Sequence, residues 1–180
     1  AIVYCNKRSI NDGLTPYYLI NEESNPDLWG DIPETANDLW NSVTYNFSNG
    51  YRLPTEQEWE FVAKSRGEYY YEYAGSDNIN SVGWYLDNSE NITHLGGLKG
   101  ANSFYSYNQL VSVYDMTGNV DEWCFNWYRI NYNSITDTAK RVFRGGAFCY
   151  IDSYCRNTSR HQSYPELRYN FLGMRLARTY

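Results

Sequence analysis

The clearest pattern of hydrophobic and polar residues in the chain lies between Thr55 and Gly67. Thr55 and Glu58 have the spacing of a capping box, in which each side chain accepts a hydrogen bond from the other residue's backbone amide. Trp59 and Phe61 begin an apolar face, and Gly67 is typical of the position after a helix. The pattern predicts a helix that starts at Thr55 and ends at Gly67.

Two weaker patterns precede this helix. Residues 1–10 combine apolar and polar positions as in the last part of an amphipathic helix, and the stop at Asp12–Gly13 ends it, so we expect its start to be missing. Residues 43–47 alternate apolar and polar side chains and are followed by Asn49–Gly50. Asn-Gly between alternating runs is the strongest short-range hairpin signal, so we predict a β-hairpin there.

Regular patterns become sparse after Gly67. Residues 76–118 are rich in Gly, Asn, Ser and Tyr, which predicts short strands and long loops. Two main helices, few short strands and much irregular structure indicate an α+β fold. With 180 residues the chain is long enough for one core, so we predict a single domain over 1–180 that is N-terminally incomplete.

Composition narrows the possible partners. A net charge of -6 and a pI near 4.9 disfavour nucleic acid, whose binders present basic surfaces. No apolar run approaches the roughly 18 residues that a transmembrane segment needs. The 20 tyrosines are too many to bury, because each buried hydroxyl needs a hydrogen-bond partner. They fit either a Tyr-rich binding surface or aromatic clusters beneath long loops. We expect a monomer.

Four motifs occur in order along the chain: Tyr51 to Glu60, Tyr114 to Trp123, Arg141 to Gly146, and Leu172 to Ala177. They resemble the formylglycine-generating-enzyme (sulfatase-modifying factor) family, whose usual forms are RLPTEAEWE, LYDMxGNVWEW, RVxRGGSW and GFRLA. The resemblance covers nearly the whole chain. It implies a C-type-lectin-like fold that lacks here the strand normally preceding the first helix.

The resemblance would assign copper-dependent oxidation of a peptidyl cysteine to two cysteines after the Gly-Gly pair. Cys149 and Cys155 follow Gly146, but their spacing departs from that of the copper-binding members. A thiolate copper pair needs tight geometry, so we expect a protein that is not an enzyme. A copper-dependent formylglycine-generating oxidase is the alternative. A lectin-like carbohydrate binder, suggested by fold class and aromatics alone, is the second.

In one branch of the family, the variable proteins of diversity-generating retroelements, adenine-directed mutagenesis rewrites the C-terminal segment. Here residues 147–172 lie between two framework motifs, and all of residues 147–154 belong to the set that this mutagenesis permits. The alternative is simple drift in a solvent-facing loop. The resemblance implies ligand-binding positions at Ala147, Phe148, Cys149, Tyr150, Ile151, Asp152, Ser153, Tyr154, Asn157, Thr158, Ser159, His161, Ser163, Tyr164, Tyr169 and Asn170.

The same resemblance implies a binding protein for diverse external macromolecules, with protein as the expected class, displayed at the cell surface or envelope. We expect the framework arginines to be held by carboxylates, with Glu122 or Asp121 as the expected partners. No cofactor should be required. A structural calcium is possible in the second motif, through oxygen ligands that suit a hard cation. Its candidate ligands are Asp115, Gly118, Val120 and Glu122. The alternative, which we favour, is that the two carboxylates bond the turn amides or meet Arg144.

Overall fold

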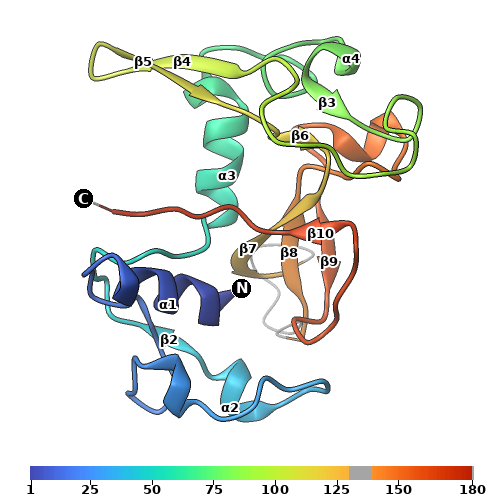
Figure 1. The fold of residues 1–180 in the computed structure, drawn as a ribbon. Coiled ribbons are helices and arrows are strands. Elements are labelled where there is room, and N and C mark those ends of the chain that lie inside the picture. Colours follow the sequence, from blue (N-terminus) through green and yellow to red (C-terminus); the bar gives the residue numbers. More distant parts are fainter. Residues whose placement is uncertain (130–138, 180) are drawn as a thin grey trace.

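The structure, a computed structural model, describes residues 1–129 and 139–179 (Figure 1). Its helices are α1 (Ile2–Asn11), α2 (Asp38–Asn41), α3 (Glu56–Ala63) and α4 (Ile79–Val82), with 3-10 turns at Pro26–Leu28, Ser65–Gly67 and Asp152–Cys155. Its strands are β1 (Tyr18–Leu19), β2 (Thr44–Tyr45), β3 (Gly83–Trp84), β4 (Asn102–Ser106), β5 (Gln109–Val113), β6 (Thr117–Gly118), β7 (Asp121–Trp127), β8 (Arg141–Arg144), β9 (His161–Ser163) and β10 (Leu172–Gly173). The predicted α+β class, with short strands and long loops, is confirmed.

The main sheet has the strand order β10-β7-β8-β9. Strand β10 runs parallel to β7, whereas β8 is antiparallel to both β7 and β9. The chain therefore leaves the middle of this sheet after β8, returns as the edge strand β9, and finally adds β10 at the other edge. In Figure 1 these segments form the orange and red side of the molecule. The region predicted to vary is thus fixed in the sheet at β9 and again at its end.

Helix α3 confirms the most local prediction. The Thr55 hydroxyl accepts from the Glu58 amide at 3.2 Å, and the Glu58 carboxylate accepts from the Thr55 amide at 2.8 Å, which completes the capping box. Trp59 is buried in a core with Met116, Cys124 and Val142. The helix ends at Ala63, earlier than predicted, and a 3-10 turn carries the chain on to Gly67.

The predicted hairpin across Asn49–Gly50 is wrong. Strand β2 pairs with β1 instead, and Phe47 adopts a left-handed backbone conformation (φ +52°) that ends the alternation. The Asn49 side chain accepts from the Thr15 amide at 3.1 Å. An added Cβ on Gly50 would lie 2.3 Å from the Thr15 carbonyl oxygen, so the glycine permits close packing rather than a turn. Long-range pairing has overridden the local signal.

A second buried cluster joins α1 to the first strands. Cys5, Tyr18, Trp29 and Leu53 pack together there. Residues from β7, and Met174 and Leu176 after β10, lie against them. The helix expected in residues 1–10 is present as α1. None of the described helices is long and apolar enough to cross a membrane. Helix α1 and strand β7 of the main sheet therefore pack against the same buried cluster.

Candidate ligand-binding surface

The C-terminal segment begins with a close approach of two backbones. Gly146 has φ +75°, and a Cβ built on it would lie 2.5 Å from the Cys155 sulfur and 2.7 Å from the Cys155 Cα. Glycine is therefore required where the chain turns out of β8. This contact holds the 3-10 turn Asp152–Cys155 against the start of the segment, so the residues between them form a short, closed loop.

Five aromatic rings from the segment pack into one group of two stacked pairs joined by tilted contacts to Tyr150. We call this group the aromatic cluster: Tyr150, Tyr154, His161, Tyr169 and Phe171. Ring centroids lie 5.4 Å apart for Tyr154 and His161, 5.3 Å apart for Tyr150 and Phe171, and 4.8 Å apart for Tyr169 and Phe171. Tyr150 links the two halves, at 5.7 Å from Tyr154 and 5.8 Å from His161. Rings that are at once stacked and exposed provide contact area that is already ordered before a ligand arrives.

The aromatic cluster is uncharged near neutral pH. Burial lowers the pKa of His161, whose Nε2 lies 3.0 Å from the Tyr154 carbonyl oxygen and whose ring stacks on Phe143 at 5.6 Å. Burial likewise raises the pKa of Tyr150. The surface therefore offers apolar faces and neutral hydrogen-bonding groups.

The predicted binding residues fall into two groups by burial. Four are buried, and the prediction that they contact a ligand is corrected: Ala147, Phe148, Asn157 and Ser163. Those that reach solvent wholly or partly are Cys149, Tyr150, Ile151, Asp152, Ser153, Tyr154, Thr158, Ser159, His161, Tyr164, Tyr169 and Asn170. Ile151 and Tyr154 are each about half exposed, at 49% and 50%. The exposed residues occupy the segment that carries the aromatic cluster.

Asn157 illustrates why some predicted positions belong to the scaffold. Its side-chain amide donates to the Tyr71 carbonyl at 3.0 Å, and its backbone amide donates to the Glu72 carbonyl at 2.9 Å. Its own carbonyl accepts from Arg144 at 2.6 Å. A residue that satisfies three backbone or charged groups is costly to replace, so this position is fixed by packing.

The floor under the segment is a buried ion-pair network. Arg144 has no exposed surface and donates to Glu56 at 2.8 Å and to Glu60 at 3.1 Å. Arg160, within the segment, donates to the second oxygen of Glu56 at 2.7 Å. Carboxylates thus hold these framework arginines, as predicted, but they are Glu56 and Glu60. Glu122 serves Arg175 instead of Arg144, and the expectation of Asp121 as an anchor is wrong, because its oxygen accepts from the Gly146 amide at 2.8 Å.

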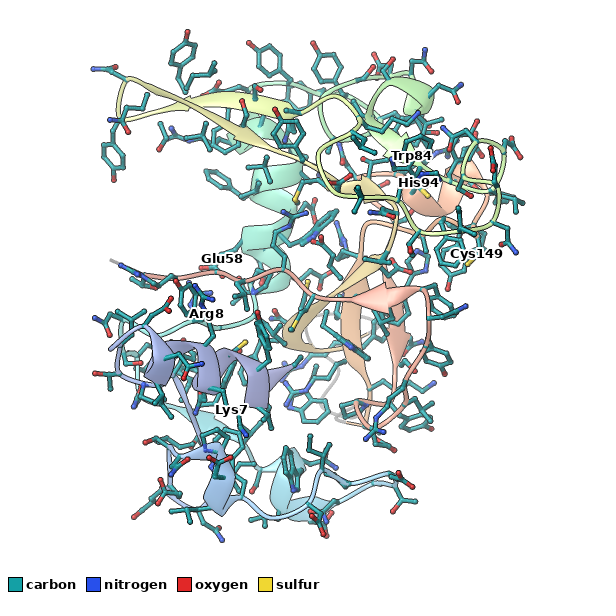
Figure 2. The ribbon with its side chains drawn as sticks, in the orientation of Figure 1. Lys7, Arg8, Glu58, Trp84, His94 and Cys149 are labelled. Carbon is teal, nitrogen blue, oxygen red and sulfur yellow. The ribbon has the colours of Figure 1, made fainter. Side chains whose placement is uncertain are left out.

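The two cysteines of the segment, Cys149 and Cys155, are free thiols, and Cys149 is labelled in Figure 2. Burial raises the pKa of Cys155 to about 12 and also raises the pKa of Cys149, which is only partly exposed. The thiolate is the reactive and metal-binding form of cysteine, and the surroundings of both residues favour the thiol. The pair lacks the electropositive surroundings that activate catalytic cysteines.

Three of the candidate calcium ligands, Asp115, Val120 and Glu122, line a shallow hollow that Arg175 also lines. Both carboxylate oxygens of Glu122 accept from Arg175, at 2.7 Å and 2.9 Å, and one also accepts from Trp59 at 2.8 Å. Asp115 accepts from the Gly97 amide at 2.7 Å. Gly118 donates its amide to the Gly145 carbonyl, and Val120 packs against Gly173. Arg175 thus neutralises Glu122, and among the described residues no group of three or more Asp, Glu, His or Cys side chains is placed to hold a metal ion.

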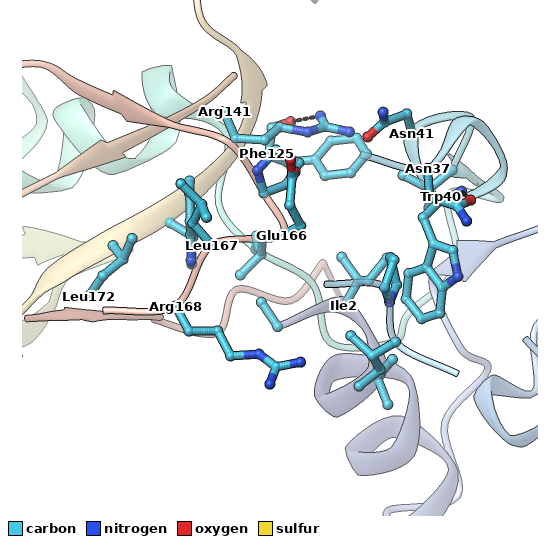
Figure 3. A pocket seen from close by; sticks show the side chains of 18 of the residues that line it. Ile2, Asn37, Trp40, Asn41, Phe125, Arg141, Glu166, Leu167, Arg168 and Leu172 are labelled. Atoms are coloured by element: carbon cyan, nitrogen blue, oxygen red, sulfur yellow. Dashed lines mark hydrogen bonds between the residues drawn. The ribbon is translucent and has the colours of Figure 1, made fainter. Parts of the chain in front are cut away.

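A cleft of about 560 Å³ lies beside the segment, between α1, α2 and the main sheet (Figure 3). Its walls include the apolar side chains of Ile2, Trp40, Leu167 and Leu172. Arg141 lies over the Trp127 ring at 3.4 Å and donates to the Phe125 carbonyl. Sequence reasoning missed this cleft, because its walls come from opposite ends of the chain. It also missed Phe171, although the alternation with Tyr169 was a usable signal.

Comparisons with known proteins agree with this architecture. The sulfatase-modifying factor enzyme 1-like domain matches residues 1–180. The chain is 34% identical over 167 residues to a Paenibacillus barcinonensis protein named chaperone protein LppX, covering 82% of this chain and 55% of that protein. It is 32% identical over 158 residues to the formylglycine-generating enzyme of Streptomyces coelicolor, and the match covers 77% of this chain and 50% of that enzyme. The chain thus spans about half the length of these curated relatives.

Two solved structures match the fold of this chain. Treponema denticola variable protein 1 matches with a TM-score of 0.81 and 30% identity, over 97% of this chain and 66% of that one. The protein CarF matches with a TM-score of 0.70 and 25% identity, over 99% of this chain and 63% of CarF. The fold is therefore the predicted C-type-lectin-like fold of the formylglycine-generating-enzyme type. By the match along its whole length, the chain belongs to the sulfatase-modifying factor enzyme 1-like family.

Proposed function

We propose that this protein is a non-enzymatic binding protein that recognises an external protein through the aromatic cluster and its exposed neighbours. One observation carries the proposal: five aromatic rings from one segment pack against one another, and two of them, Tyr154 and Tyr169, are 50% and 40% exposed. Large aromatic side chains supply most of the energy at protein interfaces.

The underlying network supports the same proposal. Arg144, just before the exposed segment, and Arg160, within it, are both tied to Glu56, so the rings rest on a buried ion-pair network. A ligand that meets an ordered surface loses less entropy on binding than one that must order a loop. The arrangement separates a rigid scaffold from an exchangeable surface.

The same separation supports diversification of the exposed positions. We propose that residues 147–172 are rewritten by a diversity-generating retroelement, as the similarity to Treponema denticola variable protein 1 suggests. Sequencing the DNA around the gene tests this. We expect a near-copy of the segment that differs only at adenines, beside a reverse-transcriptase gene. A locus with neither element would contradict the proposal.

Site-specific photo-crosslinking tests binding directly. A benzophenone amino acid at position 154 should trap a discrete partner at the surface of the source cells or of cells they contact. The same group at Tyr107, which is 99% exposed on the β4–β5 hairpin, is the matched control. Equal trapping from both positions would contradict the proposal. We further propose that the protein acts as a monomer at the cell surface or envelope.

A copper-dependent oxidase is the second candidate, favoured by the 32% identity to the formylglycine-generating enzyme of Streptomyces coelicolor. It requires Cu(I) bound by the thiolates of Cys149 and Cys155. Titration of the reduced protein with Cu(I), in wild type and in C149S/C155S, distinguishes the two functions. We expect no difference between them, because burial favours the thiol form at both positions. Thiol-dependent copper binding would revive the oxidase.

A further inference from the structure

A loop that precedes the segment by some 60 residues is fastened to it. The Leu86 amide donates to the Tyr150 carbonyl at 2.9 Å, and the Ser89 hydroxyl donates to the Phe148 carbonyl at 2.7 Å. Ser89 has no exposed surface, so its hydrogen bond is shielded from water. These two contacts hold the start of residues 86–98 against the start of the aromatic segment.

Asn119 fastens the other end of the same loop. Its side chain accepts from the His94 amide at 2.9 Å and donates to the His94 carbonyl at 3.0 Å. Its own carbonyl accepts from the Phe148 amide at 2.9 Å. One residue therefore holds both the loop and the segment, and Figure 2 places the labelled His94 and Cys149 on the same side of the molecule. The loop and the segment behave as one rigid surface.

The loop presents apolar side chains to solvent. Leu86, Ile92 and Leu95 are 43%, 54% and 79% exposed, and Ile151 of the segment is 49% exposed. Single exposed apolar residues are ordinary, but several within one loop that is fastened to the aromatic segment indicate an interaction site. The hydrogen bond from Leu86 to Tyr150 places the first of them beside Ile151. The apolar part of the surface thus continues from the aromatic cluster onto the loop.

Carboxylates flank these apolar positions. Asp87 and Glu90 in the loop and Asp152 in the segment are all exposed. Within the described chain, no lysine or arginine forms an ion pair with them at 4.0 Å or closer. The ammonium of Lys99 lies 4.0 Å from the centre of the Trp84 ring and donates to the Asn80 carbonyl. The loop and the start of the segment therefore expose apolar side chains and carboxylates that alternate along the chain.

We infer that residues 86–98 form a constant half of the binding surface, and that the partner is a protein whose apolar side chains are flanked by lysine or arginine. The inference rests on the proposed function. Complementary charge is what selects such a partner, because unpaired carboxylates steer and retain cations, whereas they repel acidic surfaces. Changes in the aromatic segment then alter which individual partner is bound, whereas the constant loop selects the class of partner.

Two synthetic peptides serve as probes: an amphipathic Leu/Lys helix and the same sequence with Glu in place of Lys. We expect the full chain to bind the lysine peptide and not the glutamate peptide in fluorescence anisotropy. The variant D87K/E90K/D152K should raise the Kd by about tenfold or more, in proportion to the cost of like charges at an interface. The control E22K/D31K/E34K carries the same charge change on exposed residues far along the chain and should raise it less than about twofold.

The apolar contribution is tested in the same way. L86S/I92S should raise the Kd by about fivefold or more, whereas L28S/L110S, on more exposed leucines elsewhere, should not. Melting temperatures confirm that all variants are folded. Equal weakening by test and control variants, or equal binding of both peptides, would overturn the inference. If Y154A weakens binding but the loop variants do not, the inference fails and the proposed function stands. If only the loop variants weaken it, both the composite surface and the proposed function fail.

Discussion

The ion-pair network beneath the segment predicts that Glu56→Ala is severely destabilising. Glu56 is 7% exposed and accepts from two guanidinium groups, those of Arg144 and Arg160. Its removal leaves the fully buried Arg144 with only the more exposed Glu60 as a carboxylate partner. An uncompensated buried charge is the costly outcome, since the guanidinium loses its counterion without regaining water.

The magnitude follows from burial. Breaking a buried pair by removing one partner costs about 3–5 kcal/mol. Each kcal/mol corresponds to about 2–4 °C in a chain of this length, so the melting temperature should fall by roughly 6–20 °C. Glu60→Ala is the matched control, because it removes a 3.1 Å contact to the same Arg144 from a side chain that is 36% exposed. Screening by solvent limits its cost to about 1 kcal/mol.

Urea unfolding and thermal melting of the two variants test this reasoning. The urea midpoint of E56A should be far below that of E60A, with the same slope m. E56A should also loosen residues 156–160, which amide hydrogen exchange detects. If E60A costs as much as E56A, or if E56A costs less than about 1 kcal/mol, the network does not stabilise the surface as argued.

Three further predictions concern other parts of the scaffold. Ser89→Ala should lower the free energy of unfolding, measured in urea, by about 1–3 kcal/mol, because the Phe148 carbonyl loses its buried donor. The control Ser112→Ala, on the exposed hairpin, should lower it by less than about 0.5 kcal/mol. Equal losses in the two variants would contradict the role of Ser89. Burial raises the pKa of Asp121 to about 7, whereas the unfolded value is about 4, so the folded state holds a proton that the unfolded state releases between these values. Stability therefore falls as pH rises from about 4 to about 7, and the urea midpoint of D121N should depend less on pH in that window; an unchanged slope would refute it. Millimolar calcium or excess chelator should leave the melting temperature unchanged, because Arg175 already neutralises Glu122, and a calcium-dependent rise would contradict this.

Sequence reasoning succeeded where the determining contacts are local. The capping box of Thr55 and Glu58 lies within four residues, and it forms as predicted. Asn49–Gly50 carries an equally local signal, yet the contact with Thr15, far away in sequence, decides its conformation. The order of motifs identified the family and hence the fold, although strand pairing itself could not be derived from any one segment.

The candidate site, too, could be predicted from the sequence only in part. The sequence identified the segment that carries the aromatic cluster, but composition alone does not distinguish buried Ser163 from partly exposed Ser159. Burial at these positions depends on where β9 enters the sheet. The loop of residues 86–98 has no pattern that points to binding, because its role depends on hydrogen bonds to Tyr150 and Phe148 across some 60 residues. Such contacts become visible only in the folded chain.

The central claim is that the aromatic cluster and its neighbours form a protein-binding surface. The most direct measurement is the affinity of the crosslinked and purified partner for Y150A/Y154A/Y164A, compared with Y70A/Y105A/Y107A, whose rings are 94%, 62% and 99% exposed elsewhere. The first variant should weaken binding by about a hundredfold or more, since interface aromatics each contribute on the order of 1–2 kcal/mol. The second should bind like the wild type. Unchanged affinity in the first variant, with its fold intact, would contradict the account.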